Sequence, residues 1–166
     1  MDKVLNEGNP SPGPRHANFT RWRKILLEPG TRLCKLTEFD LYPGGNVSPW
    51  WALDQPGVGD DPGFTAVLES ARRSGRPLAE FLRDAYAVMF EWNGLFIAQN
   101  GLLRVQRIKL VKPVYAFHGP VAKVPGKRPP MVSPANDQQY FPGGAFQVMI
   151  PGLTSAHMIG SGYHLL

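Results

Sequence analysis

Cysteine is almost absent from this chain of 166 residues, in which Cys34 is the only one. A single cysteine excludes an intrachain disulfide and a cysteine-based zinc cluster. Cys34 stands in an apolar segment with a strand-like pattern, so we expect a buried, unreactive thiol. A cysteine nucleophile would need a histidine partner, and the spacing of the four histidines selects none.

Charged residues are also few, at 19% of the chain against roughly 25% in ordinary domains. Basic residues outnumber acidic ones, which gives a net charge of +5. That excess suits an anionic ligand, nucleic acid or an acidic partner. No long basic run is interleaved with aromatic residues, as readers of single-stranded nucleic acid require. Nucleic acid is therefore a disfavoured partner.

The common motifs for phosphate binding and secretion are missing as well. There is no G-x-G-x-x-G or Walker sequence, which disfavours the usual nucleotide-binding loops. No secretory signal and no apolar run long enough to cross a membrane is visible, so we expect no membrane association. Asp60 and Asp61 are adjacent and point different ways, unlike the separated carboxylates of a glycosidase.

Glycine and proline are abundant, with 18 and 17 residues, while hydrophobic residues make up 43%. This composition predicts many turns around a modest sheet with a real core. Residues 1–18 are rich in turn formers and poor in apolar residues, which indicates a flexible arm or linker. Residues 19–166 have the length of one domain.

Apolar spacing predicts the order of helices and strands. We expect helices over 19–27, 62–73 and 77–92, and strands over 31–41, 47–51, 95–98, 102–112, 114–117, 143–151 and 160–166. The helix over 77–92 has the clearest 3.6-residue period. Helices and strands without βαβ alternation indicate an α+β fold.

The strand over 143–151 carries a polar residue in an apolar setting. Phe146, Val148 and Ile150 share one face by the two-residue period, and Gln147 and Met149 share the other. An amide in such a strand must find hydrogen bonds or face a cleft. Periodicity alone favours an edge strand with one solvated glutamine.

The sequence Gln147-Val148-Met149-Ile150-Pro151-Gly152 resembles the catalytic strand of the ADP-ribosyltransferase superfamily, in which a glutamate precedes Val-Leu-Ile-Pro-Pro. Glutamine at the glutamate position is similar to the NAD-hydrolysing branch, which includes the tuberculosis necrotizing toxin. The resemblance implies a split, mixed or antiparallel sheet with flanking helices, which agrees with the α+β class. It also implies NAD or NADP as the substrate and no metal.

The resemblance implies catalytic roles for two residues. Gln147 would hold the ribose hydroxyls while nicotinamide leaves. A glutamine cannot ionise, so it would activate a protein acceptor poorly and water becomes the expected acceptor. Ser48 lies in Val47-Ser48-Pro49, which is similar to a Leu-Ser-Pro sequence of that branch, and would hold the catalytic strand by hydrogen bonding.

The same resemblance implies aromatic contacts with nicotinamide. Trp50 or Trp51 would present a ring face, because an aromatic plane beside a desolvated cationic ring is favourable by ~1 kcal/mol or more. Strand geometry points one of the two inward and the other outward, so we expect one ligand contact. Tyr140 and Phe141 could cover the nicotinamide, although a plain surface loop is the alternative.

The resemblance also implies a cation for the diphosphate on the first strand of the sheet, which here is the strand over 31–41. Arg32 is the candidate, and Lys35, on the opposite face of that strand, is the alternate. The alternative for each residue alone is a solvated surface charge.

The resulting hypothesis is an antibacterial toxin domain that acts as an NAD glycohydrolase. It would enter a target cell's cytosol by a secretion route without a Sec signal, and a cognate immunity protein would block it. One alternative is ADP-ribosyl transfer to protein or nucleic acid. Another is a non-catalytic basic module that binds RNA or an acidic partner. A ribonuclease with His118 or His157 as base has no support from spacing.

Overall fold

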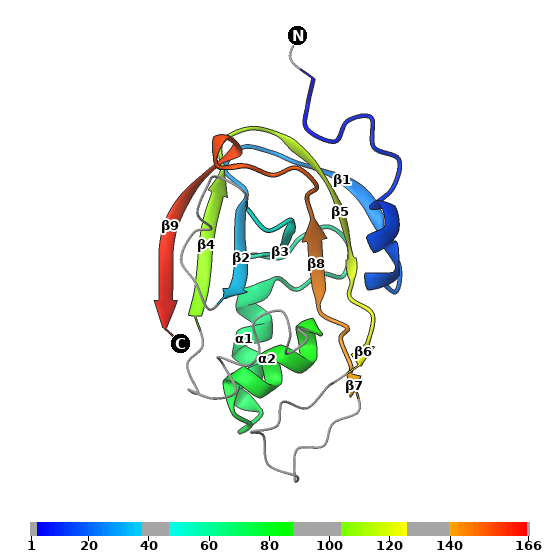
Figure 1. The fold of residues 1–166 in the computed structure, drawn as a ribbon. Coiled ribbons are helices and arrows are strands. Elements are labelled where there is room, and N and C mark those ends of the chain that lie inside the picture. The colour runs from blue at the N-terminus through cyan, green and yellow to red at the C-terminus, as the bar shows by residue number, and fades with distance from the viewer. Residues whose placement is uncertain (1–2, 38–46, 88–103, 126–139, 166) are drawn as a thin grey trace.

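The computed structural model describes residues 3–37, 47–87, 104–125 and 140–165. A seven-stranded sheet with the strand order β1-β5-β8-β3-β2-β4-β9 forms its centre (Figure 1). Every neighbouring pair in this sheet is antiparallel. Two α-helices, α1 and α2, pack against the sheet, so the predicted α+β class is confirmed.

The described elements have the following bounds. The sheet strands are β1 (Arg23–Leu27), β2 (Arg32–Thr37), β3 (Trp50–Leu53), β4 (Arg104–Leu110), β5 (Val114–Pro120), β8 (Phe146–Met149) and β9 (Met158–Leu165). A separate pair consists of β6 (Val124–Pro125) and β7 (Tyr140–Phe141). The helices are α1 (Phe64–Arg73) and α2 (Leu78–Tyr86), with 3-10 turns η1 (Gly13–Asn18) and η5 (Ser155–His157).

The two faces of the sheet bury different cores. Residues paired across antiparallel strands share a face, and alternate residues along a strand do so too. One face, here called the inner face, buries residues that include Leu33, Trp51, Ile108, Ala116, Val148 and Ile150. The other, here called the helical face, carries two clusters: Cys34, Leu36 and Ala52 pack under α1 and α2, and Trp50, Phe117 and Met149 pack with Phe19.

Most predicted elements are present where the structure describes them. The helices over 62–73 and 77–92 and the strands over 31–41, 102–112, 114–117, 143–151 and 160–166 all have counterparts. The second helix ends at Tyr86, because Ala87 takes a left-handed conformation with φ 49° that terminates a helix. The predicted strand over 95–98 lies outside the described residues. None of the described helices is long and apolar enough to cross a bilayer.

The predicted helix over residues 19–27 is wrong, since this segment contains strand β1. Ile25 and Leu27 are buried while Leu26, between them, is 43% exposed, which is a two-residue period. β1 pairs with β5 along its whole length, with Ile25 opposite Ala116. A helical spacing also fits Phe19, Trp22, Ile25 and Leu26, and pairing with a distant strand decides between helix and strand.

The segment before β1, predicted as an arm or linker, contacts the sheet. Asn6 Nδ2 donates hydrogen bonds to the carbonyl oxygens of Tyr115 (3.1 Å) and Pro151 (2.8 Å). Lys24 Nζ donates to two carbonyl oxygens of the same segment, and Pro12 is buried. Residues 3–18 therefore lie against β5 and the chain that follows β8.

Candidate functional site

Gln147 lies on β8 in the middle of the sheet. β8 is hydrogen-bonded to β5 on one side and to β3 on the other, so the edge-strand interpretation is wrong. Two residues before Gln147, Ala145 packs with the cluster under α1 and α2. Two residues after it, Met149 packs with Phe19. Gln147 therefore lies on the helical face at the junction of its two clusters.

The Gln147 side chain is available to a ligand. It is half-buried, and it makes no hydrogen bond with any part of the chain that the structure describes. Its neighbour across the ladder is Gly119 of β5. A Cβ atom at Gly119 would collide with the carbonyl oxygen of Arg21, so glycine allows the chain before β1 to cross there. The amide of Gln147 thus has backbone beside it and no competing side-chain partner.

The Trp50-Trp51 pair divides between the two faces as expected. Trp51 is buried on the inner face, 1% exposed, and its Nε1 donates to the carbonyl oxygen of Ser48 (2.7 Å). Trp50 is half-buried on the helical face, opposite Met149 and 5.2 Å from the ring centre of Phe19. Only Trp50 therefore shares a face with Gln147.

Ser48 is bonded within its own segment. Its Oγ accepts a hydrogen bond from the backbone N of Trp50 (3.2 Å), which fixes the turn that opens β3. The neighbouring Pro49 accepts from the N of Ile150, at the end of β8 beyond Gln147. This segment therefore holds β8 through backbone bonds, three residues along the strand from Gln147.

The two candidate cations lie on opposite faces of β2. Arg32 is two residues from Cys34 on the same strand, so it lies on the helical face as Cys34 does. Its side chain is exposed and has no partner among the described residues. It is paired in register with Lys109, which is exposed too. Lys35 follows Leu33 onto the inner face, away from Gln147, and burial lowers its pKa to about 8.

Substitution of Lys35 by methionine should raise stability more at neutral than at alkaline pH. Between pH 8 and the ordinary pKa of 10.5 the unfolded chain keeps a proton that the folded chain has lost, so this residue's contribution rises with pH. Below pH 8 the folded protein buries a charge, which Lys35→Met removes. At ~1.4 kcal/mol per pKa unit, the advantage of the variant should shrink by about 3 kcal/mol at most between pH 7 and 10.5.

Urea unfolding of both proteins at the two pH values measures this change. Taking the difference between the proteins cancels the titration of other groups. The same advantage at both pH values would mean that Lys35 is not desolvated.

Tyr140 and Phe141 form β7, which pairs with β6 and contacts α2. Both short strands lie near the end of the sheet where β8 begins (Figure 1). Gln147 is the second residue of β8, so β7 lies towards the end of β8 that carries Gln147. Their contact with nicotinamide stays a prediction.

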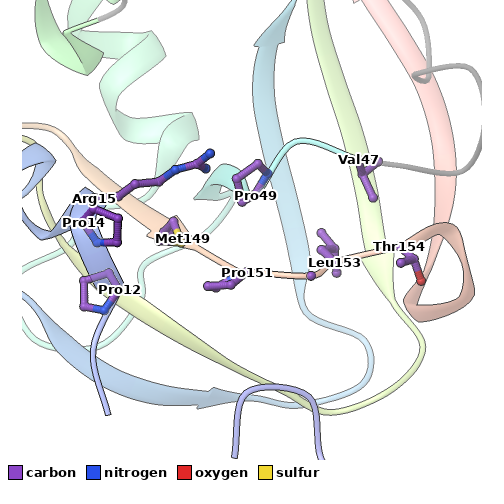
Figure 2. Close-up of a pocket in the computed structure, with 10 residues that line it drawn as sticks. Pro12, Pro14, Arg15, Val47, Pro49, Met149, Pro151, Leu153 and Thr154 are labelled. Carbon is purple, nitrogen blue, oxygen red and sulfur yellow. The ribbon is translucent and has the colours of Figure 1, made fainter. Parts of the chain in front are cut away.

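A cavity of about 410 Å³ lies at the far end of β8. Pro12 and Pro14 of the N-terminal segment face Pro49 and Pro151 across it, and Met149 lines it between them (Figure 2). Gln147 is not a lining residue. It lies two positions from Met149 on the same face of β8, a distance along the strand of about 7 Å.

A buried histidine–aspartate hydrogen bond joins the loop before α1 to β5, and sequence reasoning missed it. His118 Nε2 lies 2.7 Å from Asp61 Oδ2, with side chains 1% and 4% exposed. Asp61 Oδ1 accepts from the N of Gly63 (2.9 Å). His118 Nδ1 has no partner among the described residues. The two residues are 57 apart in sequence, and the one available signal was a histidine inside an apolar strand.

The loop over residues 54–63 is anchored at several points. Besides the His118–Asp61 pair, Arg21 forms an exposed ion pair with Asp60 (3.2 Å). At the start of the loop, Asp54 accepts from Thr65 Oγ1 (3.0 Å). These bonds anchor the loop to β5, to the chain before β1 and to α1.

Cys34 is fully buried, as expected from the sequence. Burial raises the pKa of its thiol, and the neighbouring Asp54 carboxylate adds to this rise, although Arg107 opposes it. The thiol donates to Asp54 Oδ1 (3.3 Å). A protonated, enclosed thiol is a poor nucleophile, so Cys34 is a packing residue.

The described residues hold no group of three or more histidine, cysteine, aspartate or glutamate side chains that could bind a metal. Among the described residues, the features that can meet a ligand include the Gln147 amide, the ring of Trp50, the exposed Arg32 and the proline-lined cavity. No protein-family model, no curated protein and no solved structure matches the chain.

Proposed function

We propose that this protein is an NAD glycohydrolase of the ADP-ribosyltransferase type, in which Gln147 holds the ribose next to nicotinamide. The observation that carries the proposal is the placement of Gln147. Its amide lies between two packed clusters on one face of the central strand, half-buried and without a hydrogen-bond partner among the described residues. Because the side chain is half-buried and unpaired among the described residues, its amide is free to bind a ligand in place of water.

The neighbours of Gln147 support the proposal. Trp50 lies on the same face, one strand away, with part of its surface open to a cationic ring. The candidate cation lies on β2, the candidate serine lies just before β3, and Gln147 lies on β8; these three strands lie side by side in this order. Arg32 is on the same face as Gln147, and Lys35 is not, which favours Arg32 of the two.

In the proposed reaction the bond between ribose C1′ and the nicotinamide nitrogen breaks. The electron pair leaves with nicotinamide, and the ribose carbon becomes cationic. The Gln147 side-chain oxygen accepts hydrogen bonds from ribose hydroxyls and holds the sugar as this charge develops. Water adds to C1′ and loses a proton to solvent, which gives ADP-ribose. Because glutamine cannot ionise, activation of a protein acceptor is poor and water is favoured.

Incubation of the purified protein with NAD tests the proposal directly. Equal amounts of nicotinamide and ADP-ribose should be released, as measured by liquid chromatography. Labelled NAD added to a cell lysate should leave protein and nucleic acid unlabelled. Labelled macromolecules would instead favour transfer, and no release of nicotinamide would exclude both reactions and favour a non-catalytic basic module.

The toxin role follows from the same proposal. An enzyme that consumes NAD would deplete the cytosol in which it acts, so we expect a target cell's cytosol as its site of action. A producing cell would then need an immunity protein that covers Gln147. Growth arrest on cytosolic expression, relieved by Gln147→Ala, is the expected result.

A further inference from the structure

Most side chains that line the cavity beyond β8 are apolar, and two of them are polar. Besides the four prolines and Met149, Val47 and Leu153 contribute apolar surface. Arg15 and Thr154 are the exceptions, and Figure 2 shows them at opposite ends of the lining residues. A volume of about 410 Å³, apolar walls and a few polar groups are typical of a small-molecule site.

Arg15 supplies a cation at one end. It belongs to η1, is exposed, and makes no ion pair or hydrogen bond with the described residues. Figure 2 shows its side chain extending beside Met149, the lining residue nearest to Gln147 along β8. A guanidinium there can bind a phosphate by two parallel hydrogen bonds.

Thr154 supplies a hydrogen-bond acceptor at the other end. The backbone N of Thr154 donates to His157 Nδ1 (3.3 Å), so this ring nitrogen is an acceptor. Thr154 Oγ1 lies 2.9 Å from the same nitrogen and must therefore donate its proton to it. Oγ1 also accepts from the backbone N of His157, which leaves one of its two lone pairs for a donor in the cavity.

We propose that this cavity binds the adenosine 5′-phosphate half of a dinucleotide. The proline rings and aliphatic side chains would enclose the flat purine, Arg15 would bind the phosphate, and Thr154 Oγ1 would accept from the 6-amino group. The phosphate then lies on the Gln147 side of the cavity, so the second half of the dinucleotide extends along β8 towards Gln147. That continuation depends on the proposed function, whereas binding of the adenosine 5′-phosphate half does not.

Calorimetric titration of the full chain with adenosine 5′-monophosphate, adenosine and inosine 5′-monophosphate tests the site. Removing the phosphate should weaken binding, as should replacing the 6-amino group by a carbonyl, each by roughly tenfold, because each change loses one polar contact. Arg15→Glu should weaken binding of the monophosphate by roughly tenfold or more, and leave adenosine unaffected. Arg72→Glu, an exposed change on α1 without a partner, is the matched control and should bind as the parent does.

Absence of monophosphate binding at millimolar concentration would overturn the inference, as would equal affinities in the parent and Arg15→Glu. Two further results distinguish the proposed adenosine 5′-phosphate site from the glycohydrolase proposal. Monophosphate binding that depends on Arg15, without nicotinamide release from NAD, supports the cavity assignment and contradicts the proposed function. Nicotinamide release with the same KM for NAD in Arg15→Glu supports the function and overturns the cavity assignment.

Discussion

Replacement of Gln147 by alanine is expected to slow nicotinamide release from NAD by roughly a hundredfold to a thousandfold. Removal of one preorganised group that stabilises developing charge has an effect of this order in other enzymes. The loss should fall on kcat more than on KM, because the contact strengthens as the ribose becomes cationic. The measurement is the initial rate of nicotinamide release at several NAD concentrations.

The fold should tolerate this change well. The Gln147 side chain is half-buried and has no hydrogen-bond partner among the described residues, so its truncation leaves none of their polar groups unpaired. Gln55→Ala, in the exposed loop before α1, is the matched control and should keep the parent rate. Equal rates for Gln147→Ala and the parent would remove Gln147 from the reaction.

Replacement of His118 by alanine is expected to lower the free energy of unfolding by about 3–5 kcal/mol. The change removes the buried hydrogen-bond partner of Asp61 and leaves a carboxylate that is 4% exposed with one backbone hydrogen bond, from Gly63. A buried charge without its partner is far more costly than the loss of the pair as a whole. Urea unfolding followed by tryptophan fluorescence measures the effect.

The neighbouring carboxylate provides a control for the buried pair. Asp60 is one residue earlier in the same loop, and its ion pair with Arg21 has side chains 66% and 73% exposed. Asp60→Asn should change the free energy of unfolding by no more than about 0.5 kcal/mol, because exposed ion pairs contribute little. The combination of His118→Ala with Asp61→Asn should recover part of the loss, since the second change removes the stranded charge. Simple additivity of the two losses would mean that the groups do not interact.

Local periodicity was enough to predict the elements that bury one clear stripe. α1 and α2 show a 3.6-residue period, α1 begins after Gly63 and α2 begins after Pro77. The prediction of a helix over 19–27 was wrong because the apolar residues of this segment fit both a helical and a strand period. Its partner strand β5 begins nearly 90 residues later, and no local pattern contains that pairing.

The candidate site was likewise predicted only in part. The two-residue period correctly placed Gln147 and Met149 together and separated Trp50 from Trp51. It could not place β8 in the middle of the sheet, because strand order depends on contacts far apart in sequence. The His118–Asp61 pair could not be predicted either, because the two residues are 57 apart in sequence and neither stands in a recognisable motif.

The position of β8 has a consequence for how the protein reaches its working state. β8 alone connects the β1–β5 strands to the β3–β2–β4–β9 strands in the described sheet, yet both of its neighbours, β3 and β5, come well before it along the chain. Contacts between such distant segments form slowly, so docking of β8 should be a late event. The same four residues carry Gln147, so an incompletely assembled chain cannot display the site. During refolding, catalytic competence should therefore return together with the last cooperative phase and never ahead of it.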